Sequence, residues 1–361
     1  MDICKEILNS FQVQGQIESC HRYGNGHIND TYLVATDKNK KYILQRVNHH
    51  VFKNVERLMQ NQKLITIYIA EKLKRQGIYD DRLLLNIVHT KDGNCFLRYD
   101  NNYYRCYEFI EGGECLEKIT DPLQFELSGV AFGRFQKLLN GFDTKLLFDT
   151  IPDFHNTRKR FNNLALAIEK DSAGRKKDCG NIIYEFLKRE PYADKVLGLM
   201  ACGKVPVRVT HNDTKLNNVL IDIKNSQPLA VLDLDTVMAG SALYDFGDSI
   251  RYGANKGAED EKNLEKVGFD MELFQAFSRG FISQTKDILV EDEINNLAFG
   301  AILMTYECGM RFLTDYLEGD VYFKVQRPDH NLDRAKTQLK MLEDMEKVLN
   351  QMTDYVKELY E

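Results

Sequence analysis

The chain has 361 residues, of which 28% are charged and 43% are hydrophobic, and its formal net charge is −6. This balance argues against a nucleic-acid-binding protein, because such proteins carry a basic face. The length allows a large buried core, either in two domains or in one domain with two lobes.

The sequence has no sign of export or of a membrane span. Charged residues occupy the N-terminus where a signal peptide needs an apolar core, and no apolar run reaches membrane-spanning length. The eight cysteines are scattered without a C-x-x-C pair, which is typical of reduced, buried thiols rather than of a zinc or dithiol site. We therefore expect a cytoplasmic, globular monomer without membrane or nucleic-acid partners.

The first third of the chain is predicted to be rich in strands. Residues 20–36 predict a strand, a Gly/Asn turn and a second strand, and residues 40–48 predict a third. Residues 83–113 predict further strands with turns at Asp92-Gly93 and Asn101-Asn102. Between these two regions, apolar residues at helical spacing predict a helix that contains Val55, Leu58, Ile65, Ile69 and Leu73.

Helical patterns dominate after residue 113. Asp121 followed by Pro122 is typical of a helix N-cap and first helical position, and residues 339–361 predict an amphipathic helix packed on the core. The sequence therefore predicts an α+β fold, with a small β-rich N-terminal lobe in residues 1–110 and a larger helical lobe in residues 111–361.

The stretch from Arg208 to Thr236 interrupts the helices and carries the candidate chemistry. Alternating apolar residues lead into Asp213, and two further strands are predicted as a hairpin around residues 224–228. Asp213 and Asn218 form a D-x-x-x-x-N pattern, and Asp233 ends the last strand. This layout suits phosphoryl transfer from ATP, in which one carboxylate accepts a proton while an amide oxygen and a second carboxylate hold Mg²⁺.

Simpler explanations exist for these residues. Asn and Asp are common in turns, and a lone D-x-x-x-x-N pattern is weak. A hydrolase metal site would need further ligands, but His49, His50 and His89 form no ligand-like pair. The ordered combination of strand, H-x-D-x-x-x-x-N, strand and terminal Asp favours a kinase-type site.

Motifs along most of the chain resemble one enzyme family. The segments "GHIN", "YILQ", "RVTHNDTKLNN", "DLDT", "FGDSIR", "ECGMRFL" and "DYLEGD" run from Gly26 to Asp320. They resemble the aminoglycoside phosphotransferase and choline kinase branch of the protein-kinase-like superfamily, and most closely its bacterial N-acetylhexosamine 1-kinases. The resemblance implies a bilobal protein-kinase-like fold, ATP as co-substrate, Mg²⁺ and a free N-acetylhexosamine phosphorylated at its anomeric hydroxyl. It also implies that Asp213 is the catalytic base and that Asn218 and Asp233 bind the metal.

The chain departs from protein kinases at two positions. Asn212 replaces the Arg that responds to a phosphorylated activation segment, so we expect no phosphorylation switch. Gln45 stands where a nucleotide-binding Lys ends the third strand. Lys215 offers a compensating catalytic cation beside Asp213. A non-catalytic, pseudokinase-like binding module is the alternative that Gln45 leaves open.

Further candidates surround the nucleotide and the acceptor. Gly24, Asn25 and Gly26 suit a phosphate-covering loop, although the same letters make an ordinary hairpin turn. The segment from Glu108 to Ile110 resembles a kinase hinge that binds adenine, or else it only joins the lobes. For His27, contact with the sugar and a solvent-facing turn are equally open.

The acceptor side is predicted from three more residues. Asp235 lies on the same side of the strand as Asp233, where it would assist the metal or bind the sugar. Arg311 sits in an apolar helical run, either paired with Glu307 or, as the resemblance implies, reaching sugar hydroxyls near Asp213. Tyr322 offers an apolar contact to a sugar face. A small-molecule kinase of an amino alcohol or an aminoglycoside remains the alternative enzyme.

Overall fold

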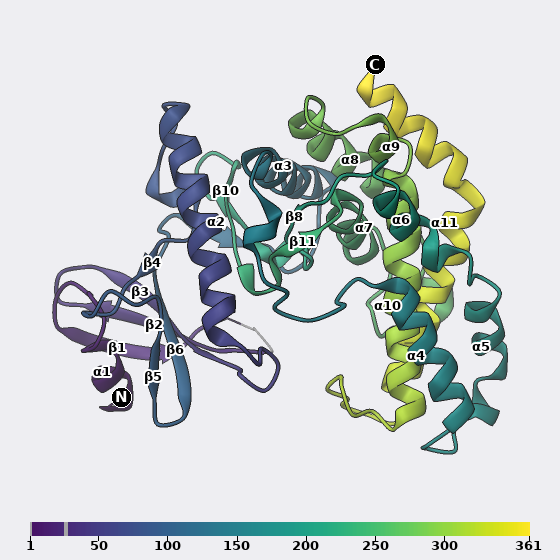
Figure 1. Cartoon of the computed structure of the whole chain (residues 1–361), viewed down its shortest axis with the longest axis horizontal. Coiled ribbons are helices and arrows are strands. Elements are labelled where there is room, and N and C mark those ends of the chain that lie inside the picture. The colour runs from purple at the N-terminus through teal and green to yellow at the C-terminus, as the bar shows by residue number, and fades with distance from the viewer. Residues whose placement is uncertain (1, 25–27) are drawn as a thin grey trace. The chain divides into compact units, whose positions relative to one another are not determined.

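The computed structural model describes residues 2–24 and 28–361, and the chain forms two compact units (Figure 1). Unit 1 comprises Met1–Cys115, Gly141–Pro152 and Val219–Ala239. Unit 2 comprises Leu116–Asn140, Asp153–Asn218 and Gly240–Glu361. Residues 111–115, Gly141–Pro152 and Val219–Ala239 thus lie in unit 1, although they follow the boundary expected at residues 110/111.

Unit 1 is built on a six-stranded antiparallel sheet with the order β1-β2-β3-β6-β4, in which β5 also pairs with β6. Its strands are β1 (Ile17–Arg22), β2 (Asp30–Thr36), β3 (Lys41–Val47), β4 (Ile87–Val88), β5 (Leu97–Tyr99) and β6 (Asn102–Glu108). The register places Gln45 of β3 opposite Thr31 of β2 and opposite Arg105 of β6. Directly opposed side chains share one face of a sheet, so these three side chains are neighbours.

Two helices pack against this sheet. Helix α1 (Asp2–Leu8) contributes Ile7 and Leu8 to a core cluster with β2, β3 and β6. Helix α2 (Val55–Arg75) begins where the Asn54 side chain accepts a hydrogen bond of 3.0 Å from the backbone N–H of Arg57. The apolar residues that predicted α2 are all buried, which confirms that helix: Val55, Leu58, Ile65, Ile69 and Leu73.

A second sheet of unit 1 has the order β10-β9-β7 and consists of β7 (Gly113–Cys115), β9 (Val219–Asp222) and β10 (Pro228–Val231). The antiparallel pairing of β9 with β10 confirms the predicted hairpin. Three-residue 3₁₀ turns η1 (Asp81–Leu83), η2 (Thr144–Leu146) and η5 (Leu234–Thr236) complete the unit. Asp233 precedes η5 in a left-handed conformation, with φ 55°.

Unit 2 is mainly helical. Its helices are α3 (Pro122–Leu139), α4 (Thr157–Lys170), α5 (Gly180–Leu187), α6 (Tyr192–Ala201), α7 (Ala242–Gly253), α8 (Met271–Thr285), α9 (Glu291–Ile294), α10 (Leu297–Glu318) and α11 (His330–Tyr360). Short elements are η3 (Lys176–Asp178), β8 (Arg208–Thr210), η4 (Leu216–Asn218) and η6 (Leu264–Lys266), and β11 (Met238–Gly240) crosses the chain boundary between the units. Asp121 caps α3 as predicted, accepting a 2.8 Å hydrogen bond from Leu123 N–H.

Glycines set the approach of α7 to α10. A Cβ added to Gly247 would lie 2.2 Å from the carbonyl oxygen of Gly300, and one added to Gly300 would lie 2.5 Å from that of Leu243. Since neither backbone has room for a methyl group, both positions need glycine. This close contact holds α7, which carries Asp245 and Asp248, against the helix that carries Arg311.

The strand-rich N-terminal and helical C-terminal parts confirm the predicted α+β class. In Figure 1 the last helix, α11, lies along α10, and its buried residues include Met341, Leu342 and Met345, as expected for core packing. Within residues 2–24 and 28–361, no helix is both long and apolar enough to cross a membrane. The eight cysteines are free thiols, as expected, but Cys115 and Cys202 are exposed rather than buried.

Candidate active site

The loop after β8 brings three predicted residues of unit 2 together. Lys215 Nζ lies 2.8 Å from Asp213 Oδ1, and the Asn218 side-chain amide donates to Asp213 Oδ2 at 3.2 Å and to the Asp213 carbonyl at 2.8 Å. The Asp213 side chain is 27% exposed, so it is accessible to solvent. The negative charge of Asp213 raises the pKa of Lys215 above its ordinary value, although burial opposes this effect.

A buried carboxylate on α7 holds the backbone of this loop. Asp245 accepts hydrogen bonds from the N–H groups of His211 at 2.9 Å and Asn212 at 2.8 Å, and Gln136 donates to it at 2.7 Å. Burial raises the pKa of Asp245, and these donors oppose the rise. Asn212 adopts the left-handed conformation, with φ 64°, which Asn tolerates better than most residues. Asp245 therefore supports the backbone of this loop.

A second carboxylate of α7 lies beneath the same loop. Asp248 accepts from the Thr214 N–H at 3.2 Å and from Arg251 Nε at 2.7 Å. Burial works against ionisation of Asp248, but the charges of Arg251 and Lys215 outweigh it and lower the pKa of Asp248. The loop therefore rests on a fixed array of charges, as electrostatic preorganisation requires.

The third support comes from His155 and Glu307, neither of which was predicted as a site residue. His155 Nδ1 lies 2.8 Å from Glu307 Oε1, while Nε2 lies 3.4 Å from the carbonyl oxygen of Asn212. Thr157 donates to the other oxygen of Glu307. Burial opposes ionisation of Glu307, yet its contact with His155 lowers the pKa of Glu307 below its usual value. This helix α10 carboxylate is thereby linked to the loop that carries Asp213.

We expect Glu307→Gln to weaken folding in a pH-dependent way. Because the pKa of Glu307 is lower in the folded chain, its charge stabilises the fold above the usual glutamate pKa of 4.5, and this contribution is lost as pH falls through the folded value. The variant should lose about 2 kcal/mol of unfolding free energy at pH 7, with a smaller difference from wild type at acidic pH. Urea unfolding at several pH values measures this. Glu318→Gln, an exposed change on the same helix, is the control, and an equal loss at every pH would contradict the assignment.

Arg311 lies in an aromatic setting on α10. Its guanidinium carbon is 5.3 Å from the ring centre of Phe154, 5.9 Å from that of Tyr322 and 5.5 Å from that of Phe323. Among the described residues, none forms a hydrogen bond or a salt bridge with its five N–H donors. Burial is the main cause that lowers the pKa of Arg160, and the nearby positive charge of Arg311 lowers it further. The site thus presents positive charge and aromatic rings.

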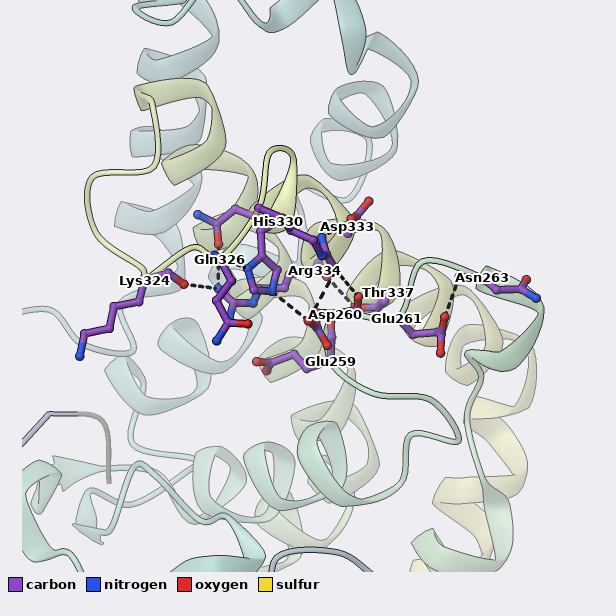
Figure 2. Close-up of polar contacts among 12 residues, drawn as sticks. Glu259, Asp260, Glu261, Asn263, Lys324, Gln326, His330, Asp333, Arg334 and Thr337 are labelled. Carbon is purple, nitrogen blue, oxygen red and sulfur yellow. Dashed lines mark hydrogen bonds and ion pairs between the residues drawn. The ribbon is translucent and has the colours of Figure 1, made fainter. Parts of the chain in front are cut away.

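The segment from Asp320 to Asp329 carries Tyr322, whose side chain is exposed, and several contacts anchor it. Asp315 of α10 accepts from the N–H groups of Tyr322 at 2.7 Å and Phe323 at 2.9 Å. Figure 2 shows a second anchor, in which the Gln326 N–H donates to His330 Nδ1 at 3.1 Å and His330 Nε2 lies 2.9 Å from Asp260. Since Nδ1 accepts, neutral His330 carries its proton on Nε2 and donates it to Asp260. These contacts fix the backbone that carries the Tyr322 side chain.

Unit 1 holds the other predicted residues. Asp233 is exposed at the start of η5, whereas Asp235, two residues later, is buried and bonded to Arg105, Gln62 and Asn29. Gln45 Nε2 donates to Thr31 Oγ1 at 3.0 Å. Arg105 and Gln62 were not predicted from the sequence as site residues. The one signal for Arg105 was a charged residue inside a strand that is apolar on both faces.

The predicted nucleotide-binding segments also lie in unit 1. Gly24 has φ +72°, a backbone conformation that favours glycine. Asn25, Gly26 and His27 lie outside the described residues. In the hinge segment, the Glu108 N–H donates to the Asn86 carbonyl at 3.0 Å and Ile110 is buried. The adenine-binding role of Glu108 and Ile110 stays a prediction.

The available donors fit magnesium. No group of three or more His, Cys, Asp or Glu side chains suited to a metal occurs among residues 2–24 and 28–361. Mg²⁺ requires less, because it binds one or two protein oxygens together with nucleotide phosphates and water. The Asn218 amide nitrogen is turned toward Asp213, which leaves its oxygen on the other side, and Asp233 supplies an exposed carboxylate.

Comparison with known proteins gives one family match and several structural matches. An aminoglycoside phosphotransferase from Alicyclobacillus acidocaldarius is 13% identical over 98% of this chain and 96% of its own, with a TM-score of 0.61. A spectinomycin phosphotransferase in complex with ADP and spectinomycin is 14% identical over 97% of this chain and 98% of its own, with a TM-score of 0.61. A choline kinase from Cryptosporidium parvum is 15% identical over 100% and 99%, with a TM-score of 0.56.

The structural similarity to these proteins, with TM-scores of 0.61, shows a shared fold and confirms the predicted kinase-like class. A model described as the phosphotransferase enzyme family matches residues 19–277, more than half of the sequence. The chain therefore belongs to the phosphotransferase enzyme family.

Proposed function

We propose that the chain is an ATP- and Mg²⁺-dependent kinase that phosphorylates a free N-acetylhexosamine, N-acetylglucosamine or N-acetylgalactosamine, at its anomeric hydroxyl. Membership of the phosphotransferase family supports the reaction class, and the motif resemblance supports the sugar. Asp213, with Lys215 and Asn218 at hydrogen-bond distance, supports a catalytic centre in unit 2.

The observation that carries the acceptor class is Arg311. Its donors have rings around them and no protein acceptor among the described residues, so it suits a ligand that offers hydroxyl and carbonyl oxygens. Choline, amino alcohols and aminoglycosides are cations, which Arg311 and Arg160 would repel. The contacts from Glu307 through His155 to Asn212 tie the preceding turn of α10 to the catalytic loop, which supports a place for Arg311 beside the acceptor.

The residues of the chain have defined parts in this reaction. Asp213 accepts the proton of the anomeric hydroxyl. As it does so, the anomeric oxygen of the sugar bonds to the γ-phosphorus of ATP, and the bond from that phosphorus to the leaving ADP breaks. Lys215 offsets negative charge beside Asp213. Mg²⁺, held by Asn218 and Asp233 when bound, would neutralise phosphate charge. His27 and Tyr322 are assigned to the sugar.

The nucleotide is assigned to unit 1. Gly24, Asn25 and Gly26 would cover the phosphates through backbone N–H groups, and Glu108 and Ile110 would bind adenine. Gln45 would adjoin the phosphates in place of the usual Lys. Asp235 was expected to bind substrate, and this stays untested. Its contacts with Arg105, Gln62 and Asn29 favour a supporting role.

The decisive experiment is a substrate screen with MgATP. We expect turnover with N-acetylglucosamine or N-acetylgalactosamine and none with choline, ethanolamine or aminoglycosides. The product should be a 1-phosphate that dilute acid hydrolyses, because an anomeric phosphate is acid-labile. The 6-deoxy sugar should react, while the methyl glycoside, whose anomeric oxygen is blocked, should be inert.

Each failure has a distinct meaning. An acid-stable product, or turnover of the methyl glycoside, would contradict transfer to the anomeric oxygen. Turnover of a cationic acceptor alone would favour the amino alcohol or aminoglycoside kinase. Binding of MgADP without turnover of any acceptor would favour the pseudokinase-like module that Gln45 raises.

A further inference from the structure

Arg105 in the middle of β6 is a buried cation with no part in the reaction described above. Its side chain is 1% exposed, and an unpaired charge so deeply buried would cost several kcal/mol. Nη1 and Nη2 donate to the two carboxylate oxygens of Asp235, which is 3% exposed, and Nε donates to Gln45 Oε1 at 2.9 Å. Burial opposes the charge, but Asp235 raises the pKa of Arg105 above its ordinary value. Because the Arg105 guanidinium is enclosed in this way, it can influence a ligand only through its partners Asp235 and Gln45.

Asp235 collects donors from separate segments of unit 1. Gln62 of α2 donates to Oδ1 at 2.7 Å, and Asn29, just before β2, donates to Oδ2 at 2.7 Å. The Tyr107 hydroxyl donates to Gln62 Oε1 and so orients that amide. One carboxylate therefore joins the sheet, α2, Asn29 and the turn after β10.

This network replaces an ion pair that protein kinases place elsewhere. There, a Lys of the third strand pairs with a helix Glu and contacts the nucleotide phosphates. Here β3 and α2 contribute the neutral amides Gln45 and Gln62, and the opposite charges lie on β6 and on the turn after β10. The charged member of the turn is Asp235, two residues after Asp233.

We propose that Arg105 is a positioning residue which, through Asp235, orients the turn that carries Asp233. By orienting this turn, Arg105 controls how strongly Mg²⁺ promotes nucleotide binding. The inference rests on the proposed function in one respect, namely that Asp233 binds the metal. Residues that orient metal ligands typically change metal affinity or activity by about 10–100-fold when they are replaced.

The test measures ADP binding by calorimetry, with and without Mg²⁺ and without any acceptor. The variant Arg105→Met/Asp235→Asn removes both buried charges together, so that neither is left unpaired. We expect it to fold and to bind Mg²⁺-free ADP like wild type. The strengthening of ADP binding by Mg²⁺ should require about 10–100-fold more Mg²⁺. Arg105→Lys keeps the charge without the two-pronged contact. Its Mg²⁺ requirement should lie between those of wild type and the double variant.

Arg189→Met is the matched control, because Arg189 is 7% exposed and makes a two-pronged contact with Glu346 in unit 2. It should lower the melting temperature without altering the Mg²⁺ requirement. A folded double variant with the wild-type Mg²⁺ requirement would overturn the inference alone, and if it does not fold, Arg105→Lys decides in the same way. A wild-type protein whose ADP binding gains nothing from Mg²⁺ would overturn the proposed function as well.

Discussion

Asp213→Asn is expected to lower kcat by about 10²–10⁴-fold while MgADP still binds. The amide matches the carboxylate in size but cannot take the proton from the attacking hydroxyl. Neighbouring contacts change little in shape, because Asn218 donates to the Asp213 backbone carbonyl as well as to its side chain. Steady-state kinetics with the preferred sugar and calorimetry with MgADP measure the two effects separately.

Asp344→Asn is the matched control for this change. Asp344 also pairs with lysines, Lys340 and Lys347, and its side chain is 24% exposed against 27% for Asp213. Loss of a lysine-paired carboxylate at Asp344 should leave kcat unchanged. If Asp213→Asn instead lost MgADP binding and kept kcat, the residue would position the nucleotide and another group would act as the base.

Local patterns were enough to predict much of the fold. The hairpin of β9 and β10, the cap at Asp121 and the apolar stripe of α2 each depend on residues a few positions apart. The catalytic loop is local as well, since Asp213, Lys215 and Asn218 contact one another within a single turn of chain. The spacing of these residues along the sequence was therefore enough to predict that they lie together.

Contacts between distant segments could not be predicted in the same way. Arg105 and Asp235 are 130 residues apart, and His155 and Glu307 are 152 residues apart. A single sequence indicates only that an Arg inside an apolar strand needs a partner. It does not identify that partner.

The boundary between the units illustrates the same limit. A boundary at residues 110/111 follows the change from strand to helix patterns along the chain. The structure groups Val219–Ala239 with unit 1, because β9 pairs with β7 and because the turn after β10 contributes Asp235 to the Arg105 network. The amino-acid composition of a segment does not indicate that it packs in a unit formed by an earlier part of the chain.

The network also bears on the significance of Gln45. A missing lysine in the third strand suggested a non-catalytic module. In unit 1, however, Gln45 accepts from Arg105 and donates to Thr31, so β3 remains linked to a cation on β6 and to a hydroxyl on β2. A rearranged charge pair of this kind favours an active kinase over a degenerate one.

Asp233→Ala should reduce turnover by about 10³-fold or more. Metal coordination contributes several kcal/mol of charge stabilisation in the transition state, and each 1.36 kcal/mol corresponds to about tenfold in rate. Binding of Mg²⁺-free ADP should persist, because Asp233 would touch the nucleotide only through the metal. Single-turnover assays and calorimetry with and without Mg²⁺ measure both.

Backbone strain at Asp233 requires a specific control, since Ala is less stable than Asp in the left-handed conformation. Asp100 is also exposed, also belongs to unit 1 and has φ 45° against 55° for Asp233. Asp100→Ala should therefore lower the melting temperature about as much as Asp233→Ala does, and yet retain full turnover and the normal gain in ADP binding from Mg²⁺. Equal losses of turnover in the two variants would trace the effect to strain and remove Asp233 from the metal site, whereas a loss confined to Asp233→Ala would assign the carboxylate to Mg²⁺.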